Sequence, residues 1–206
     1  MERTVKALDA APTPTVAGLV PAAGSSRRMG RDKRRLTTPG GLTVLEATVA
    51  SLRQGGVAPV IVVLEERSPC LALPGLEGTV LAANPAPERG MLSSILVGLD
   101  RVPDAASAVA VLPGDHPFVP AAAVQALLRC FALERPLLLA PRYSGRRGHP
   151  LLIARALFAE ARACDPGVGL RQLVQRRAAD LLELDLDYDD EAEQDLDTPE
   201  DLERLT

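Results

Sequence analysis

One short segment concentrates the residue types that bind phosphate. Residues 17–20 are apolar, and residues 20–33 then contain two glycines, two serines, three arginines and one lysine. Glycines let a backbone approach a phosphate, backbone amides point at it, and cationic side chains neutralise it. The residues that could offer amides, hydroxyls or charge are Gly24, Ser25, Ser26, Arg27, Arg28 and Lys33. A strand followed by such a loop is typical of an anion site in an α/β protein, and a solvated basic loop is the alternative.

Lys33 stands out by composition. The chain contains 21 arginines but only two lysines, Lys6 and Lys33. A compact ammonium group on a flexible stem suits a mobile phosphate better than a rigid guanidinium fork does. The loop matches neither G-x-x-x-x-G-K-[ST] nor G-x-G-x-x-G, so the two common phosphate-binding motifs do not describe it.

Asp115 is a candidate metal ligand. It comes just after the apolar residues 108–112, which we expect to form a buried strand. Mg²⁺ is held in proteins by one or two carboxylates together with substrate phosphates, and a carboxylate at the end of a strand can meet both. The alternative is a turn residue that hydrogen-bonds its own backbone.

The C-terminal part of the chain is strongly acidic. Residues 185–203 include 11 acidic residues out of 19, most of which must form a solvated face. Asp195 and Asp197 are separated by one leucine, so in an extended chain both point to the same side. Both are candidates for a functional role, and support for a helix cap at Thr198 is the alternative role of Asp197.

His149 lies in a Gly-His-Pro sequence, residues 148–150. It could contact a substrate or hydrogen-bond within a turn. The chain has one other histidine, His116, so a histidine metal site is not indicated. No Ser-His-Asp or Cys-His arrangement is suggested, which argues against a hydrolase with a covalent nucleophile.

The elements that must position these residues alternate along the chain. Apolar runs predict strands at residues 17–20, 60–64, 79–82, 108–112, 136–140 and 181–186. Helical signals cover 43–54, 91–102, 124–131, 154–163 and 170–177, with a terminal helix after Thr198. Strand–helix alternation favours a mostly parallel sheet with its ligand at the carboxyl ends of the strands. We expect residues 1–15 to be a flexible tail, residues 16–206 to form one domain, and residues 142–150 to form an exposed turn.

Composition excludes several classes of protein. A net charge of −4 and only 2% aromatic residues argue against a nucleic-acid partner. No run of 18 apolar residues is present, so we expect no membrane association and a cytoplasmic location. Three cysteines, far apart and odd in number, suggest neither a disulfide framework nor a zinc site.

Five motifs in order carry a family resemblance. Residues 22–30 with Lys33 read Ala-Ala-Gly-x-Ser-x-Arg-Met-Gly followed by Lys, and Asn84 to Ser94 reads Asn-Pro-x4-Gly-Met-x2-Ser. The others are residues 112–117 with Asp115, residues 148–150, and residues 195–202. Together they resemble the MobA-like nucleotidyltransferases, most closely the molybdenum cofactor cytidylyltransferase (MocA-like) branch, over residues 17–205.

The resemblance implies a three-layer α/β/α Rossmann-like nucleotidyltransferase fold with a mostly parallel sheet. It also implies a reaction in which the terminal phosphate of molybdopterin attacks the α-phosphorus of CTP and pyrophosphate is released, with Mg²⁺ as the cofactor. Catalysis would come from positioning and charge neutralisation. A molybdenum hydroxylase would be a partner.

The resemblance also implies roles for individual residues. Lys33 and Arg27 would stabilise the triphosphate, Asp115 would bind Mg²⁺, and Asp197 would be the second carboxylate. The nucleotide-binding residues would be Ala22, Ala23, Gly24, Ser25, Ser26, Arg28, Asn84, Gly90 and Ser94. Those on the acceptor side would be Gly148, His149 and Pro150.

Several alternatives stay open at this point. The family's guanylyltransferases usually carry Gly-Gly where this chain has Ala23-Gly24, which favours CTP over GTP. A guanylyl, sugar-phosphate or isoprenoid-type nucleotidyltransferase is the alternative enzyme. A cofactor-binding chaperone that delivers molybdenum cofactor without turnover is an alternative from another class.

Overall fold

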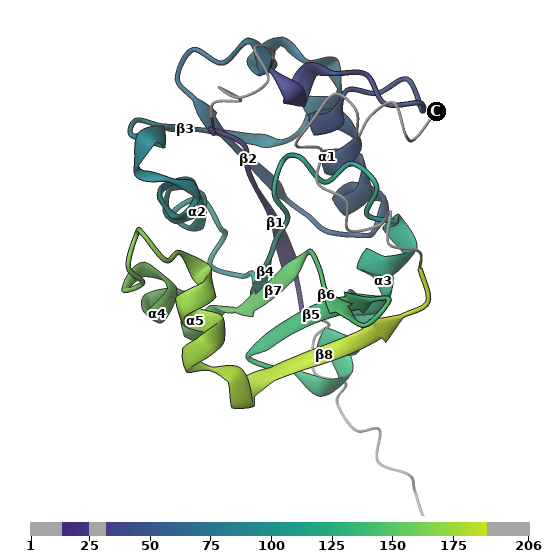
Figure 1. Cartoon of the computed structure of the whole chain (residues 1–206), viewed down its shortest axis with the longest axis vertical. Coiled ribbons are helices and arrows are strands. Elements are labelled where there is room, and N and C mark those ends of the chain that lie inside the picture. The colour runs from purple at the N-terminus through teal and green to yellow at the C-terminus, as the bar shows by residue number, and fades with distance from the viewer. Residues whose placement is uncertain (1–13, 25–31, 189–206) are drawn as a thin grey trace, which may run out of the picture.

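The computed structural model describes residues 14–24 and 32–188, and these form a helix-covered sheet (Figure 1). Its strands are β1 (Val16–Pro21), β2 (Val60–Glu65), β3 (Val80–Asn84), β4 (Ala108–Val111), β5 (Leu138–Tyr143), β6 (Arg146–Arg147), β7 (Leu151–Ala154) and β8 (Leu181–Leu186). The α-helices are α1 (Val44–Gln54), α2 (Met91–Leu99), α3 (Ala121–Glu134), α4 (Phe158–Arg162) and α5 (Leu170–Arg176). Short 3₁₀ turns are η1 (Lys33–Arg35), η2 (Pro69–Ala72), η3 (Pro74–Leu76), η4 (Pro87–Arg89), η5 (Arg155–Leu157) and η6 (Ala178–Asp180).

The sheet is mostly parallel, as predicted. Its order is β3-β2-β1-β4-β7-β5, and both β6 and β8 pair with β5. Strands β3, β2, β1 and β4 are parallel neighbours, whereas β7 is antiparallel to both β4 and β5. Strand β8 pairs with the whole length of β5. Strands β6 and β7 therefore share the other side of β5. Residues 148–150 interrupt that line between β6 and β7.

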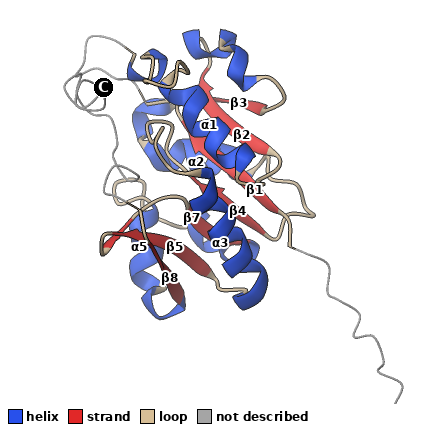
Figure 2. Cartoon of the chain, turned by 90° about the vertical axis from the view of Figure 1, so that its right-hand side faces the viewer, coloured by secondary structure: helices blue, strands red, loops and turns tan. Residues whose placement is uncertain are grey.

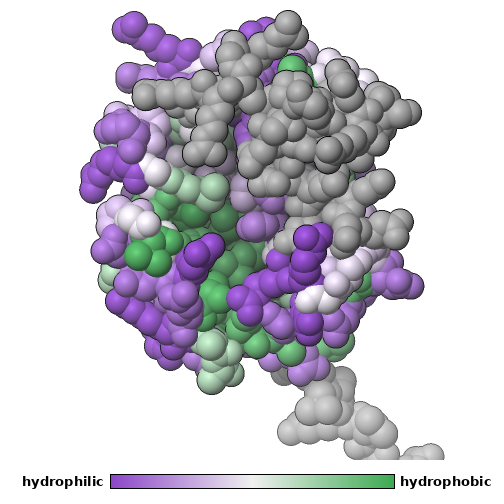
Figure 3. Space-filling view, in the orientation of Figure 1, coloured by the Kyte–Doolittle hydropathy of each residue, from purple (hydrophilic) through white to green (hydrophobic). Residues whose placement is uncertain are grey.

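Two apolar cores give the three layers visible in Figure 2. Successive residues of a strand point to opposite faces, so Leu19 and Val20 belong to different cores. The Val20 core packs against α1 and α3, and the Leu19 core packs against α2, α4 and α5. On the face seen in Figure 3, hydrophobic surface gathers in a hollow near the centre of the view.

Helix α1 begins and ends where the sequence predicts. The Thr43 hydroxyl accepts from the Glu46 backbone N–H, and the Glu46 carboxylate accepts from the Thr43 backbone N–H, which is a complete capping box. Gly55 follows the helix at its crossing with α3, where a Cβ on Gly55 would lie 2.4 Å from Val124. Only glycine allows the two helices to approach this closely.

Some local expectations are wrong. Helix α2 ends at Leu99 rather than at 102, and Met91 at its start is 55% exposed. The buried stripe starts one residue later, because Leu92 shares a helix face with Ile95 and Leu99. Residues 142–150 are not an exposed turn as a whole, since Tyr143 ends β5 with a fully buried ring. Val102 is buried beyond the end of helix α2, so an apolar residue at helical spacing does not by itself mark the helix boundary.

No helix in the described ranges is long and apolar enough to cross a membrane. The predicted flexible tail and terminal helix fall on residues 1–13 and 189–206, apart from Pro14 and Thr15, and so lie outside the described residues.

Candidate functional site

The loops after β1 and β4 lie side by side at the carboxyl edge of the sheet. The Gly114 backbone N–H donates to the Pro21 carbonyl oxygen at 3.2 Å, which brings the turn after β4 against the end of β1. A Cβ on Gly114 would lie 2.8 Å from the Cβ of Ala22, closer than real Cβ contacts come. Gly114 therefore lets the predicted metal-binding turn approach the predicted phosphate loop.

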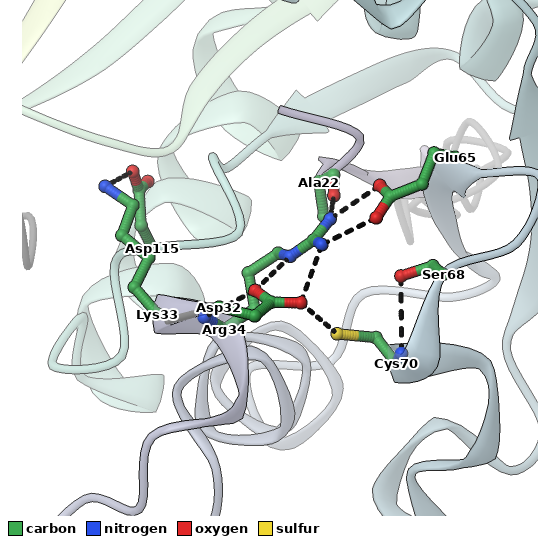
Figure 4. Close-up of polar contacts among 8 residues, drawn as sticks. All are labelled: Ala22, Asp32, Lys33, Arg34, Glu65, Ser68, Cys70 and Asp115. Atoms are coloured by element: carbon green, nitrogen blue, oxygen red, sulfur yellow. Dashed lines mark hydrogen bonds and ion pairs between the residues drawn. The ribbon is translucent and has the colours of Figure 1, made fainter. Parts of the chain in front are cut away.

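Lys33 and Asp115 meet across this edge. The Lys33 Nζ lies 2.8 Å from Asp115 Oδ2, and the two side chains are 16% and 22% exposed (Figure 4). Burial raises the pKa of Asp115, but hydrogen bonds and electrostatic interactions with His116 and Lys33 lower it by more, so this pKa lies well below its usual range. The structure thus brings these two predicted site residues together, and the carboxylate is ionised at neutral pH.

His116 is the second partner of Asp115. Its Nδ1 lies 3.0 Å from Asp115 Oδ1, and its side chain is 8% exposed. The rings of His116 and His149 pack edge to face with centroids 4.7 Å apart. Segment 148–150, predicted to face an acceptor, therefore lies next to the turn that carries Asp115.

His149 is held by its backbone and has an unsatisfied ring nitrogen. Its carbonyl oxygen accepts from the Tyr143 hydroxyl at 3.0 Å, and the Gly148 N–H donates to the Pro141 carbonyl oxygen at 2.9 Å. Within the described chain, His149 Nδ1 is buried without a hydrogen-bond partner. Burial lowers the pKa of His149 to about 4, and the neighbouring His116 adds to this effect. The ring is therefore neutral at pH 7, and its Nδ1 has no hydrogen-bond partner among the described residues.

Asp115 has the chemistry to hold a hard cation. A carboxylate has about four lone-pair sites, and the contacts with Lys33 and His116 leave further acceptor capacity. The described residues contain no group of three or more His, Cys, Asp or Glu side chains that could hold a metal ion. A single carboxylate with open acceptor sites can hold an ion such as Mg²⁺, which keeps several waters and takes its other ligands from substrate phosphates. Asp195 and Asp197 lie outside the described residues.

The predicted phosphate loop is described in part. Ala22 and Ala23 are buried, and Gly24 is exposed with no atom within 4 Å of an added Cβ. Ser25, Ser26, Arg27 and Arg28 lie outside the described residues, so their phosphate contacts stay a prediction.

The side chains of Asn84 and Ser94 hydrogen-bond to each other. The Asn84 amide donates to Ser93 Oγ at 2.8 Å and to Ser94 Oγ at 2.9 Å, and its oxygen accepts from the Ala86 N–H. Both Asn84 and Ser94 are buried, at 2% and 3% exposure. In this structure they fix the shape of the segment that leads to Gly90, which is exposed at the start of α2. Their contact with a nucleotide stays a prediction.

A family model described as the MobA-like NTP transferase domain matches residues 18–181. The chain belongs to this family. The match spans every strand from β2 to β7 and most of β1, and it includes both Lys33 and Asp115. The resemblance inferred from the five motifs is therefore confirmed at the level of the family.

Two curated relatives differ in how much of the chain they match. Nicotine blue oxidoreductase of Paenarthrobacter nicotinovorans is 30% identical over 200 residues, which covers 93% of this chain and 97% of that protein. A probable molybdenum cofactor guanylyltransferase of Mycobacterium tuberculosis is 39% identical over 80 residues, only 38% of this chain and 40% of the relative. The relatives support membership of the family, but their names state two different activities.

Solved structures agree with the fold. The structure of Rv0371c from Mycobacterium tuberculosis superposes with a TM-score of 0.81 and 29% identity, over 94% of this chain and 98% of that one. The same protein is also known as a complex with manganese. A nucleotidyl transferase from Methanothermobacter thermautotroptrophicus superposes with a TM-score of 0.76 at 20% identity, over 93% and 95% of the two chains. The three-layer Rossmann-like fold with a mostly parallel sheet is confirmed in this MobA-like chain.

Sequence reasoning missed several residues of this site. His116 directly follows Asp115, and His149 is the only other histidine of the chain. The position of His116 beside a predicted metal ligand could have marked it as a site residue. Arg34 is one of three consecutive basic residues, and nothing in the sequence says that it is buried while Arg35 is exposed. Glu65 ends the apolar strand β2 at its carboxyl end, which marks it as a candidate only once the sheet is known.

Proposed function

We propose that this MobA-like protein is a Mg²⁺-dependent cytidylyltransferase that transfers CMP from CTP to the phosphate of molybdopterin. The observation that carries the proposal is the 2.8 Å approach of Lys33 to Asp115, beside the loop that begins at Ala22. A cation for phosphate and a carboxylate for a metal ion are the two groups that nucleotidyl transfer requires at one place. The confirmed family supports the reaction class.

The chemistry needs no covalent intermediate on the protein. A phosphate monoester is mostly dianionic at neutral pH, because its second pKa is about 6, and its oxygen can attack without a general base. A bond forms between that oxygen and the α-phosphorus of CTP. The bond from the α-phosphorus to the bridging oxygen breaks, and pyrophosphate leaves with that electron pair.

The chain's residues stabilise the charge that develops in this step. Lys33 and Arg27 neutralise the departing pyrophosphate, and backbone amides around Gly24 hold phosphate oxygens. Asp115, with Asp197 as the second carboxylate, would hold Mg²⁺, which would neutralise negative charge on the phosphates. Before the nucleotide arrives, Lys33 and Asp115 neutralise each other. When the nucleotide binds, Lys33 would contact the triphosphate in place of Asp115, which would leave the Asp115 carboxylate to hold the metal ion.

The acceptor is proposed to lie on the His149 side. Its buried Nδ1, which has no partner in the described chain, supports a contact with a polar group of the acceptor. Gly148 and Pro150 are buried and hold the segment against β5 and β7. An acceptor phosphate there would approach the α-phosphorus from beside the Asp115 turn.

The test is a panel of nucleotides against a panel of acceptors. Pyrophosphate release is measured with CTP, GTP or ATP, each with Mg²⁺ and either molybdopterin, a sugar phosphate or an isoprenoid-precursor phosphate. The proposal predicts release with CTP and molybdopterin above all other combinations. Preference for GTP would correct the nucleotide, and preference for another phosphate would correct the acceptor. No release with any pair would overturn the reaction, and cofactor delivery to a molybdenum hydroxylase without turnover would favour the chaperone.

An oxidoreductase is the second candidate, because the relative that spans nearly the whole chain is named as one. Oxidation of NADH or NADPH in the presence of a quinonoid dye measures it directly. Turnover there that survives Asp115→Asn would favour this candidate over nucleotidyl transfer.

A further inference from the structure

Arg34 is a buried cation whose every donor is used. Its guanidinium Nε and Nη2 donate to the two Asp32 carboxylate oxygens at 2.7 and 2.8 Å. Nη1 and Nη2 donate to the two Glu65 oxygens, both at 2.8 Å, and Nη1 also donates to the Ala22 carbonyl oxygen. Arginine has five N–H donors, so none is left over, and only 5% of the residue is exposed.

The acceptors tie three segments together. Ala22 directly follows β1, Glu65 is the last residue of β2, and Asp32 caps the 3₁₀ turn η1. Two bidentate carboxylate pairs fix the plane of a guanidinium as well as its position, which a single ammonium contact would not do. Cys70 Sγ donates to the same Asp32 at 3.6 Å and restrains that carboxylate further. Arg34 thus attaches η1 to the carboxyl ends of β1 and β2.

Electrostatics keep the cluster charged. Burial raises the pKa values of Asp32 and Glu65, but hydrogen bonds and charge from Arg34 lower them more, so both fall below their usual range. Burial lowers the pKa of Arg34, and the two carboxylates raise it well above its ordinary value. All three groups therefore stay ionised over the working pH range and the contacts persist.

The attachment fixes the direction of the neighbouring residue. A 3₁₀ turn has three residues per turn, so consecutive side chains point roughly 120° apart. With Arg34 directed toward Glu65, Lys33 is directed away from it and toward Asp115, as Figure 4 shows. The turn is also held from the other side, because the Val44 N–H donates to the Leu36 carbonyl oxygen.

We infer that Arg34 is a positioning residue, which holds the Lys33 ammonium at the point where it meets Asp115 and the triphosphate. This inference rests on the proposed function, which makes the position of the Lys33 ammonium a triphosphate-binding site. The position of Lys33 itself can be measured without turnover. A buried ion pair is weak evidence of a stabilising role, since apolar groups of similar volume often serve as well. A cation that stabilises a transfer reaction must be held in a precise position, because a displacement of about 1 Å can lower the rate roughly 100-fold.

The chain offers a direct probe of this placement, since Lys6 and Lys33 are its only lysines. Reductive methylation with ¹³C-formaldehyde labels them and the N-terminal amine, and Lys6→Arg assigns the Lys33 signal. Asp115→Asn gives the position of that signal when the ion pair is broken. In Arg34→Met the Lys33 signal is expected to move at least halfway to this reference, whereas in Arg35→Met, an exposed residue of the same turn, it stays at the wild-type position. An unmoved signal in folded Arg34→Met would overturn the inference.

The fold itself needs a control, because Arg34→Met leaves two partly buried carboxylates without their cation. If that variant does not fold, the triple change Arg34→Met, Asp32→Asn and Glu65→Gln removes the charges together and is measured in the same way. Its Lys33 signal is expected to move as well, and a wild-type position would contradict the positioning role.

A double-mutant cycle separates positioning from general stability. Arg34→Met is expected to lower kcat for pyrophosphate release about 100-fold in the wild-type background. In the Lys33→Met background the same change is expected to lower kcat less than about threefold, because the group that Arg34 positions is gone. If the kcat loss of the double variant is the product of the two single losses, Arg34 acts independently of Lys33. A wild-type protein that releases no pyrophosphate would overturn the proposed function instead, and the Lys33 signal would still decide the role of Arg34.

Discussion

The Lys33 ammonium and the Asp115 carboxylate lie 2.8 Å apart, although they come from loops that follow different strands. Strands β1 and β4 are parallel neighbours, so the loops after them leave the sheet at the same edge. The pairing of a basic loop with an acidic turn is therefore a consequence of the topology. It places one cation and one carboxylate side by side, as the proposed binding of a triphosphate and a metal ion requires.

Replacing Lys33 with arginine is expected to lower kcat about 100-fold while leaving the melting temperature within a few degrees of wild type. Charge is kept, but a planar guanidinium fork cannot occupy the place of a compact ammonium beside Asp115. Steady-state pyrophosphate release measures the effect. Lys6→Arg is the matched control and should keep full activity, and full activity of Lys33→Arg would show that any cation suffices there.

Acid should destabilise the protein through His149. Its folded pKa of about 4 lies below the unfolded value of about 6.5, so the unfolded state takes up a proton first as the pH falls. Stability contributed by the neutral ring is complete above about pH 6.5 and is lost as the pH falls toward 4. The loss corresponds to roughly 3 kcal/mol.

Urea unfolding at pH 7 and at pH 4.5 measures this dependence. His149→Gln has no titrating ring and should lose less stability over the same interval than wild type does. Equal losses in the two proteins would mean that His149 titrates normally in the folded state.

Gly114→Ala is expected to cost about 1–3 kcal/mol of unfolding free energy, because the new methyl group would overlap the Ala22 side chain. The turn that carries Asp115 would have to move away from β1, so activity should fall as well. Gly40→Ala is the control, since a Cβ there would meet only Thr38 Oγ1, at 3.8 Å. Adding Ala22→Gly to Gly114→Ala should restore stability, and a double variant no more stable than the single one would refute the overlap.

The order of the elements could be predicted from sequence because local signals mark them. The capping box at Thr43 and the run of β-branched residues in β2 each specify one element without help from the rest of the chain. The short β6 could not be predicted, since residues 142–150 give no alternation, and the antiparallel direction of β7 depends on its pairing with β4 and β5. Tertiary pairing decided those strands.

The site could be predicted in composition but only partly in geometry. Lys33, Asp115 and His149 were identified from their types and positions, and the structure brings them to one edge. The burial of Arg34, by contrast, depends on Glu65 and Ala22 from other strands, and no local pattern reports such a contact. Residues that bind a substrate carry a signal in their type, whereas residues that position them are defined by their neighbours.

The central claim is that Asp115 holds the metal ion of a nucleotidyl transfer. Asp115→Asn keeps the size of the side chain and removes the charge that a metal ion requires. We expect little change in folding, and the melting temperature of the variant checks this.

The measurement that tests the claim most directly is the rate of pyrophosphate release by wild type and by Asp115→Asn, with CTP, Mg²⁺ and molybdopterin. Wild-type turnover that EDTA abolishes, with a loss of several orders of magnitude in folded Asp115→Asn, is the predicted result. Full turnover by Asp115→Asn would contradict the assignment of Asp115, and the absence of turnover by wild type would contradict the account of the whole site.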